Sequence, residues 1–174
     1  TFVSTNHAIL YERLKPVFAD VDNSFCMDPA DAERLVGPRT RAIMFVGMGG
    51  NAGRMNDVRE LCLKYGLKFI LDGAHMAGTY MDGVHVGRNA DAACFSFHSV
   101  KNLPTADAGM VCFQRPEFDA AARRLSWLGI DKDTYTRTTE GKKYAWKYDV
   151  PHVGFKYHGN SVMAAIGLAQ LRHL

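Results

Sequence analysis

The chain has 174 residues, of which 47% are hydrophobic and 22% are charged, and its formal net charge at pH 7 is +3. These values are typical of a globular protein with one sizeable core, so we expect one domain. Lysine and arginine are scattered, which argues against a nucleic-acid-binding surface. No apolar run approaches a membrane span and no signal-like region opens the chain, so we predict a cytoplasmic protein without a membrane partner.

The four cysteines form no CxxC pair. Cys62, Cys94 and Cys112 each lie within an apolar run. We therefore predict buried thiols in a reducing compartment rather than disulfides, and the same interpretation covers Cys26.

The first half of the chain alternates between strand-like and helix-like segments. Strands are predicted at residues 1–4, 16–22, 41–47 and 68–75, and helices at residues 6–14, 28–36 and 56–66. This alternation is typical of βαβ units, so we expect an α/β fold with a mostly parallel, buried sheet.

Two helix starts and one helix end carry recognisable signals. Asp28 before Pro29 predicts an N-cap followed by proline in the first turn, and Asn56 is the N-cap predicted for the next helix, which Gly66 ends.

The second half continues with buried strands at 92–97 and 109–113 and a helix over 116–129. Residues 131–149 have no clear period and are expected to form a long loop or excursion. The closing helix carries an apolar stripe that indicates either core or a subunit interface, formed by Met163, Ile166, Leu168 and Leu171. Both chain ends fall inside predicted elements, so we expect part of a longer protein.

Chemically capable side chains follow two of the predicted strands, where ligands gather in an open α/β sheet. Asp72 ends a strand, and Ser96, His98 and Lys101 follow another. A carboxylate after three large apolar residues needs a cation or strong donors, although Asp72 could instead cap a helix starting at Gly73. Lys101 is either an ordinary solvent-exposed side chain or a residue with a role in catalysis.

The motifs "ILDGAHMAG", "SFHSVKN" and "DAGMV", in this order, resemble the DegT/DnrJ/StrS family of pyridoxal-phosphate-dependent sugar aminotransferases. The opening "TFVSTNHAIL" and the closing "VGFKYHGNSVMAAIGLAQL" are similar as well, so the resemblance covers nearly the whole chain. It implies a three-layer, mostly parallel mixed sheet flanked by helices, the large domain of fold type I. Residues 1–174 would be a partial cofactor-binding domain, without the phosphate-loop segment and the small domain, and inactive alone.

The resemblance also implies residue roles. Lys101, in the S-F-H-x-x-K-N motif, would form a Schiff base with pyridoxal 5'-phosphate and move a proton in the half-reaction that yields the pyridoxamine form. Asp72, in the D-x-A-H motif, would keep the pyridine nitrogen protonated.

Further cofactor contacts are implied for Ser96 at the phosphate, His75 near the phenolic oxygen, Phe2 on the ring face, and His98 and Asn160. Taken alone, these could equally be a strand-end hydroxyl, a structural histidine and a core aromatic residue. His158 and Gly159 stand where many relatives have an asparagine that reaches the neighbouring subunit's phosphate, so that contact is open.

The implied activity moves an amino group from glutamate or glutamine to a keto carbon of a nucleotide-linked deoxysugar, in a homodimer, for a polysaccharide or a natural product. The sugar, the nucleotide and the C3 or C4 position stay undetermined. Lys101 argues against the related sugar dehydrases, which carry histidine there.

Three alternatives remain open at this stage. Asp72 and His75 could bind a metal with His85 or His98, although no organised motif supports this and we predict no metal. The chain could be a catalytically silent binding or regulatory paralogue. The run "GMGGNAG" at 47–53 could allow close backbone approach to the ligand or be a plain flexible turn.

Overall fold

The computed structural model describes residues 2–131 and 148–174, so most of the loop predicted at 131–149 lies outside the described residues. The chain divides into two compact units, Thr1–Gln114 with Val162–Leu174, and Arg115–Ser161. The assignment of the whole chain to one partial large domain stays a prediction.

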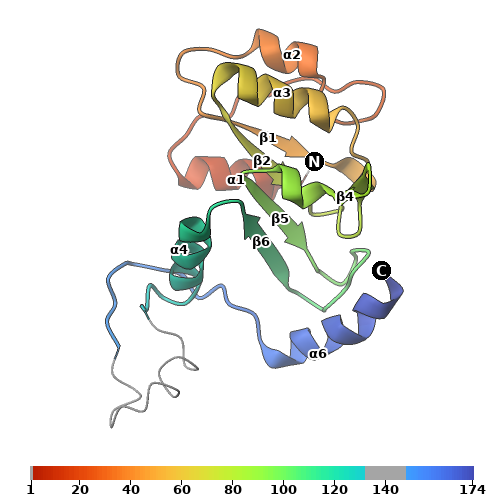
Figure 1. Ribbon diagram of the computed structural model, residues 1–174. Helices are drawn as coiled ribbons and strands as arrows, with labels where there is room; N and C mark the ends of the chain where they lie inside the picture. The colour runs from red at the N-terminus through yellow and green to blue at the C-terminus, as the bar shows by residue number, and fades with distance from the viewer. Residues whose placement is uncertain (1, 132–147) are drawn as a thin grey trace. The chain divides into compact units, whose positions relative to one another are not determined.

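A four-stranded mixed sheet forms the centre of the first unit (Figure 1). Its order is β1 (Ala42–Val46), β2 (Lys68–Asp72), β5 (Ala92–Ser96) and β6 (Gly109–Phe113). The first three strands are parallel and β6 is antiparallel to β5. The predicted mostly parallel mixed sheet is therefore confirmed.

A small antiparallel pair, β3 (Tyr80–Met81) with β4 (Val84–His85), follows β2 and leads into the short helix η2 (Val86–Asn89).

One face of the main sheet carries most of the core. Alternating residues of the three parallel strands are buried on it, namely Ile43, Phe45, Phe69, Leu71, Ala93 and Phe95. Helix α3 (Met55–Tyr65) contacts β1 and β2 from this side, and α2 (Pro29–Arg34) contacts α3. The period of two along each strand places these apolar side chains together against the helix.

The opposite face of the sheet is less covered, which corrects one cysteine prediction. Cys94 lies on this face and is exposed, because it alternates with the buried neighbours of β5. Cys26 and Cys62 are buried as expected, and Cys112 is half-buried. Burial, followed by the charge of Asp91, raises the pKa of the Cys62 thiol to about 11.

Strand β6 is also more exposed than predicted. Met110 and Val111 are both exposed, so β6 is only partly buried in this chain.

The two strands predicted near the N-terminus are wrong. Within the first predicted strand, Val3 and Ser4 belong to helix α1 (Val3–Tyr11), and Phe2 is its N-cap in extended conformation. Residues 16–22 form only an isolated bridge between Val21 and Met27. Strand propensity takes effect only where a neighbouring strand can pair, and neither segment has such a strand among the described residues.

The helix signals were right in two cases of three. The Asp28 side chain accepts a hydrogen bond from the Ala30 N–H at 3.0 Å, and Gly66 closes α3 in the left-handed conformation. Asn56 is not a cap, because α3 already starts at Met55, which is fully buried. Packing of Met55 thus overrides the local capping preference.

Helices also follow β6, as predicted. In the second unit, α4 (Pro116–Ser126) leads to Trp127, which forms a bridge with Lys156. The predicted closing helix is α6 (Ser161–Gln170), continued by η3 (Leu171–His173). No residue of α6 is buried, so its apolar stripe is not core here, and the interface role stays a prediction. None of the described helices is long and apolar enough to cross a membrane.

We predict that Leu71→Ala lowers the free energy of unfolding by about 2–5 kcal/mol, because Leu71 is fully buried and its truncation leaves a cavity. Leu63→Ala is the matched control, since Leu63 is exposed on α3. Urea denaturation followed by circular dichroism measures both changes. Equal losses would contradict the placement of the core.

Candidate active site

The carboxyl ends of the parallel strands bring two predicted site residues to one edge of the sheet. Asp72 ends β2 and is paired with Val46 of β1 and Cys94 of β5. Ser96 lies two residues beyond Cys94 and therefore shares a face with Asp72. The structure thus places Asp72 and Ser96 on the same edge and the same face, away from the core side.

The Asp72 carboxylate is held at both oxygens. The Thr5 hydroxyl of α1 donates to Oδ2 at 2.6 Å, and the Ala74 N–H donates to Oδ1 at 3.2 Å. No described helix begins at Gly73, so the capping alternative for Asp72 is wrong. Because a carboxylate can accept about four hydrogen bonds, the half-buried Asp72 keeps acceptor capacity for a cationic ligand.

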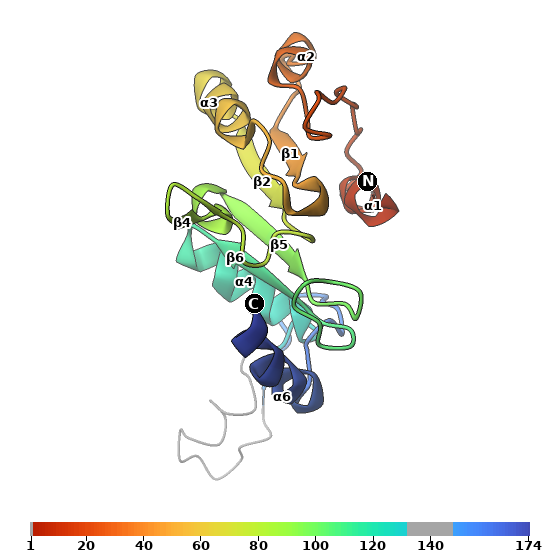
Figure 2. The same ribbon diagram turned by 90° about the vertical axis from the view of Figure 1, so that its right-hand side faces the viewer.

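Thr5 is the contact that sequence reasoning missed. Thr5 lies between the strand predicted at 1–4 and the helix predicted at 6–14, and the sequence alone predicts no role for it. Figure 2 shows α1 on the other side of β1 and β2 from α3, which is the side of the Asp72 carboxylate. No local sequence motif predicts this contact, because it joins residues far apart in the sequence.

Lys101 lies in the connection between β5 and β6, as predicted. The loop is anchored by Thr105, whose buried hydroxyl and N–H both donate to the Phe97 carbonyl. The Asn102 side chain donates to the Ala77 carbonyl and so ties the loop to the segment that follows β2.

The Lys101 ammonium makes no hydrogen bond or ion pair with any described residue, although the side chain is half-buried. By contrast, Lys64 and Lys68 form ion pairs with Glu33 and Asp91. A half-buried lysine whose amine is unengaged among the described residues is a candidate for covalent catalysis.

The predicted histidines near the edge differ in their partners. His75 follows β2, and its Nδ1 accepts a hydrogen bond from the Gly49 N–H at 3.1 Å. Nδ1 of His98 accepts a hydrogen bond from the Val100 backbone N–H at 3.4 Å, and the backbone N–H of His98 donates to the Ser96 hydroxyl oxygen at 3.4 Å.

The remaining predicted cofactor residues are Phe2 and Asn160. Phe2 is 76% exposed at the start of α1, one turn before Thr5, and touches no ring in the described residues. Asn160 belongs to the second unit, and its role stays a prediction.

The proposed metal set does not assemble. His85 packs against Tyr80 and Phe95 at ring distances of 5.3 Å, and burial lowers its pKa. Phe95 is on the core face of the sheet, whereas Asp72 is on the opposite face. Within residues 2–131 and 148–174, no three metal-ligating side chains gather.

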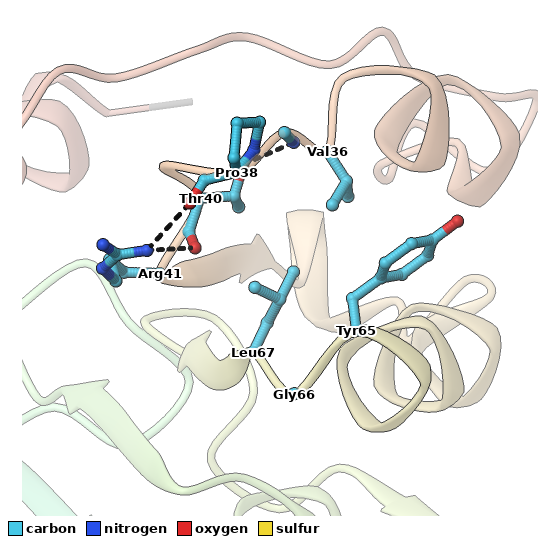
Figure 3. A pocket seen from close by; sticks show the side chains of 8 residues that line it. Val36, Pro38, Thr40, Arg41, Tyr65, Gly66 and Leu67 are labelled. Atoms are coloured by element: carbon cyan, nitrogen blue, oxygen red, sulfur yellow. Dashed lines mark hydrogen bonds between the residues drawn. The ribbon is translucent and has the colours of Figure 1, made fainter.

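A hollow of about 550 Å³ lies at the other edge of the sheet, where β1 and β2 begin (Figure 3). It is bordered by Val36, Pro38 and Tyr65, and the Arg41 guanidinium at its rim donates to the Pro38 and Thr40 carbonyls. None of the predicted site residues lines this hollow, so the strand carboxyl edge remains the candidate site.

We predict that Thr5→Val lowers the free energy of unfolding by about 1.5–3 kcal/mol, the range for a hydrogen bond to a charged group. Thr5→Ser is the control that keeps the hydroxyl, and it should recover most of the loss. Urea denaturation at neutral pH measures both. A Thr5→Val protein as stable as wild type would show that α1 is not held by Asp72.

The chain is similar to several proteins of known sequence or structure. SpsC, a spore coat polysaccharide biosynthesis protein of Bacillus subtilis, is 35% identical over the whole chain, which spans 44% of the SpsC length. The pyridoxamine-phosphate form of a putative sugar aminotransferase, Spr1654 from Streptococcus pneumoniae, superposes with a TM-score of 0.89 at 25% identity. Its alignment covers 99% of this chain and 48% of Spr1654.

DesI, solved in the presence of its TDP-sugar product, superposes with a TM-score of 0.81 at 31% identity, over 99% of this chain and 41% of DesI. This chain therefore spans less than half of each of these proteins. The family match extends over residues 1–174 and leaves no segment outside it. The chain belongs to the DegT/DnrJ/EryC1/StrS aminotransferase family.

Proposed function

We propose that the protein is a pyridoxal-phosphate-dependent aminotransferase that transfers an amino group from glutamate or glutamine to a keto carbon of a nucleotide-linked sugar. Membership of the aminotransferase family supports the reaction class. The proposal concerns the whole protein, since the chain spans less than half the length of these relatives.

One observation carries this proposal: Lys101 is a half-buried lysine whose amine is unengaged among the described residues. It lies on a loop fixed by the buried Thr105 and by the contact between Asn102 and Ala77. A free amine on an anchored loop suits covalent attachment to an aldehyde, followed by proton transfer next to the reacting carbon.

Asp72 supplies the second chemical requirement. The cofactor, when bound, acts as an electron sink, and a carboxylate at its pyridine nitrogen keeps that nitrogen protonated. Thr5 and Ala74 fix both oxygens of Asp72, which holds the carboxylate in one orientation. Lys101 and Asp72 therefore fit the chemical groups of the cofactor.

The remaining cofactor contacts in the proposal follow from the family resemblance. Ser96, on the same face as Asp72, would bind the phosphate, and His75 would contact the phenolic oxygen. Phe2, His98 and Asn160 are assigned by resemblance, and the exposure of Phe2 leaves its ring available for stacking.

The substrate class and setting follow the relatives' descriptions. DesI was solved with a TDP-sugar product, which supports a nucleotide-linked sugar, and SpsC is named for polysaccharide biosynthesis. The pyridoxamine-phosphate form of Spr1654 supports the cofactor. A homodimer and a cytoplasmic location complete the proposal.

The silent-paralogue alternative keeps the fold and the cofactor but lacks turnover. The presence of Lys101 disfavours this alternative, and turnover of an amino donor discriminates between the two. A dehydrase is disfavoured because Lys101 stands where that subgroup has histidine.

We predict that borohydride reduction of the protein with pyridoxal phosphate links the cofactor covalently to Lys101. Peptide mapping by mass spectrometry locates the adduct, and Lys101→Ala should abolish it. Lys15→Ala is the matched control, because Lys15 is exposed and far along the chain from the motif. An adduct on another lysine would sink the assignment of Lys101.

Catalytic turnover separates the aminotransferase from a silent paralogue. With ¹⁵N-glutamate and a nucleotide-linked keto sugar, we expect the label in the sugar product, detected by mass spectrometry. Lys101→Ala should reduce the rate by at least about 10²-fold, the lower range for loss of a positioned acid–base group. Cofactor attachment without transfer across a panel of keto sugars and both donors would favour the silent paralogue.

A further inference from the structure

The glycine-rich run at 47–53 packs against the segment that follows β2. The Gly49 N–H donates to Nδ1 of His75 at 3.1 Å, and the Thr79 hydroxyl donates to the Gly50 carbonyl at 3.1 Å. A methyl group added at Gly50 would lie 3.1 Å from the His75 carbonyl oxygen, and one added at Gly47 would overlap the Met76 side chain. The run therefore packs closely against the residues that follow β2, and its approach to a ligand stays a prediction.

The contact at His75 fixes where its ring proton lies. A backbone N–H can only donate, so Nδ1 must offer a lone pair. A neutral imidazole then carries its proton on Nε2, and this atom makes no hydrogen bond within the described part of the chain. Nε2–H is thus a donor without a partner among the described residues.

We propose that Gly49 is a positioning residue that holds His75 as the Nε2–H tautomer, so that His75 donates a hydrogen bond to an oxygen of the bound ligand. The identity of that oxygen, the phenolic oxygen of the cofactor, rests on the proposed function. The tautomer itself does not.

The other histidines with a backbone donor show why this contact is distinctive. His85 accepts from Gly87 at 3.3 Å and His98 from Val100 at 3.4 Å, so each ring bonds a residue two positions ahead in its own turn. His75 instead bonds the loop after β1 across 26 positions of sequence. The contact couples two strand ends that meet at the site edge.

Backbone conformation explains glycine at position 49. Its φ is +61°, in the left-handed region, and an added Cβ would meet nothing within 4 Å. Asparagine tolerates this conformation, whereas a β-branched residue is strongly disfavoured there. Gly49→Asn and Gly49→Val therefore form a matched pair that keeps or disturbs the N–H direction.

The test is ¹⁵N NMR of the histidine rings and the Gly49 amide in the cofactor-free whole protein, with the His75 signals assigned by their loss in His75→Gln. In wild type we expect a protonated Nε2, an unprotonated Nδ1 and a scalar coupling from the Gly49 amide nitrogen to Nδ1. Gly49→Asn should keep all three. Gly49→Val should lose the coupling and shift the ring towards the tautomer mixture of a solvated histidine.

A wild-type ring protonated at Nδ1, or the absence of coupling in wild type, would overturn the tautomer lock without reference to any variant. An unchanged coupling in Gly49→Val would overturn the role of the glycine conformation.

Addition of pyridoxal phosphate tests the ligand contact separately. In wild type, the Nε2–H signal of His75 should shift when the cofactor binds. Gly49→Val should bind the cofactor several-fold more weakly than wild type. The double variant with His75→Phe should bind it no more weakly than His75→Phe alone. A bound cofactor that leaves the signal unchanged would overturn the contact to the ligand. Failure of the wild-type protein to bind the cofactor at all would instead contradict the proposed function, and the cofactor-free spectra would still decide the tautomer.

Discussion

The half-buried carboxylate of Asp72 is the constraint around which the candidate site is organised. An anion at the end of a buried strand is stable only if donors surround it, and Thr5 and Ala74 supply one donor to each oxygen. The contact with Thr5 ties α1 to the sheet on the side opposite α3. The same interaction that satisfies a polar group therefore also positions a helix and orients the carboxylate for a cation.

The parallel register carries this organisation to the neighbouring elements. Strands β1, β2 and β5 end at one edge, so the loops that follow them meet there. Each loop is fixed by a contact to another loop: Gly49 bonds His75, and Asn102 bonds Ala77. Lys101 is thereby held on an anchored loop while its amine stays unengaged among the described residues. An anchored loop that presents an unengaged lysine amine is compatible with the proposed covalent attachment of a cofactor.

The sequence predicted the parts whose signals are local or periodic. The strands at 41–47, 68–75 and 92–97, the cap at Asp28 and the end at Gly66 follow from apolar alternation and from turn chemistry, and β1, β2 and β5 lie within these ranges. The placement of Asp72 and Ser96 at one edge follows from the parallel topology.

The errors and omissions share one physical cause, which is dependence on distant partners. Residues 16–22 have strand-like composition, but no strand of the described part of the chain lies beside them. Cys94 is exposed because helix α3 covers only the other face of the sheet. The roles of Thr5 and Gly49 depend on contacts with residues far away in sequence, so no local pattern could reveal them. The cofactor itself was suggested by family motifs, not by periodicity.

The most direct test of the central claim is a crystal structure of the whole protein with pyridoxal phosphate. We predict a hydrogen bond from the pyridine nitrogen to an Asp72 carboxylate oxygen, Thr5 still donating to the carboxylate, and a covalent bond between Lys101 Nζ and the cofactor. A cofactor bound elsewhere, or bound with its ring nitrogen away from Asp72, would contradict the claim that this carboxylate organises the site.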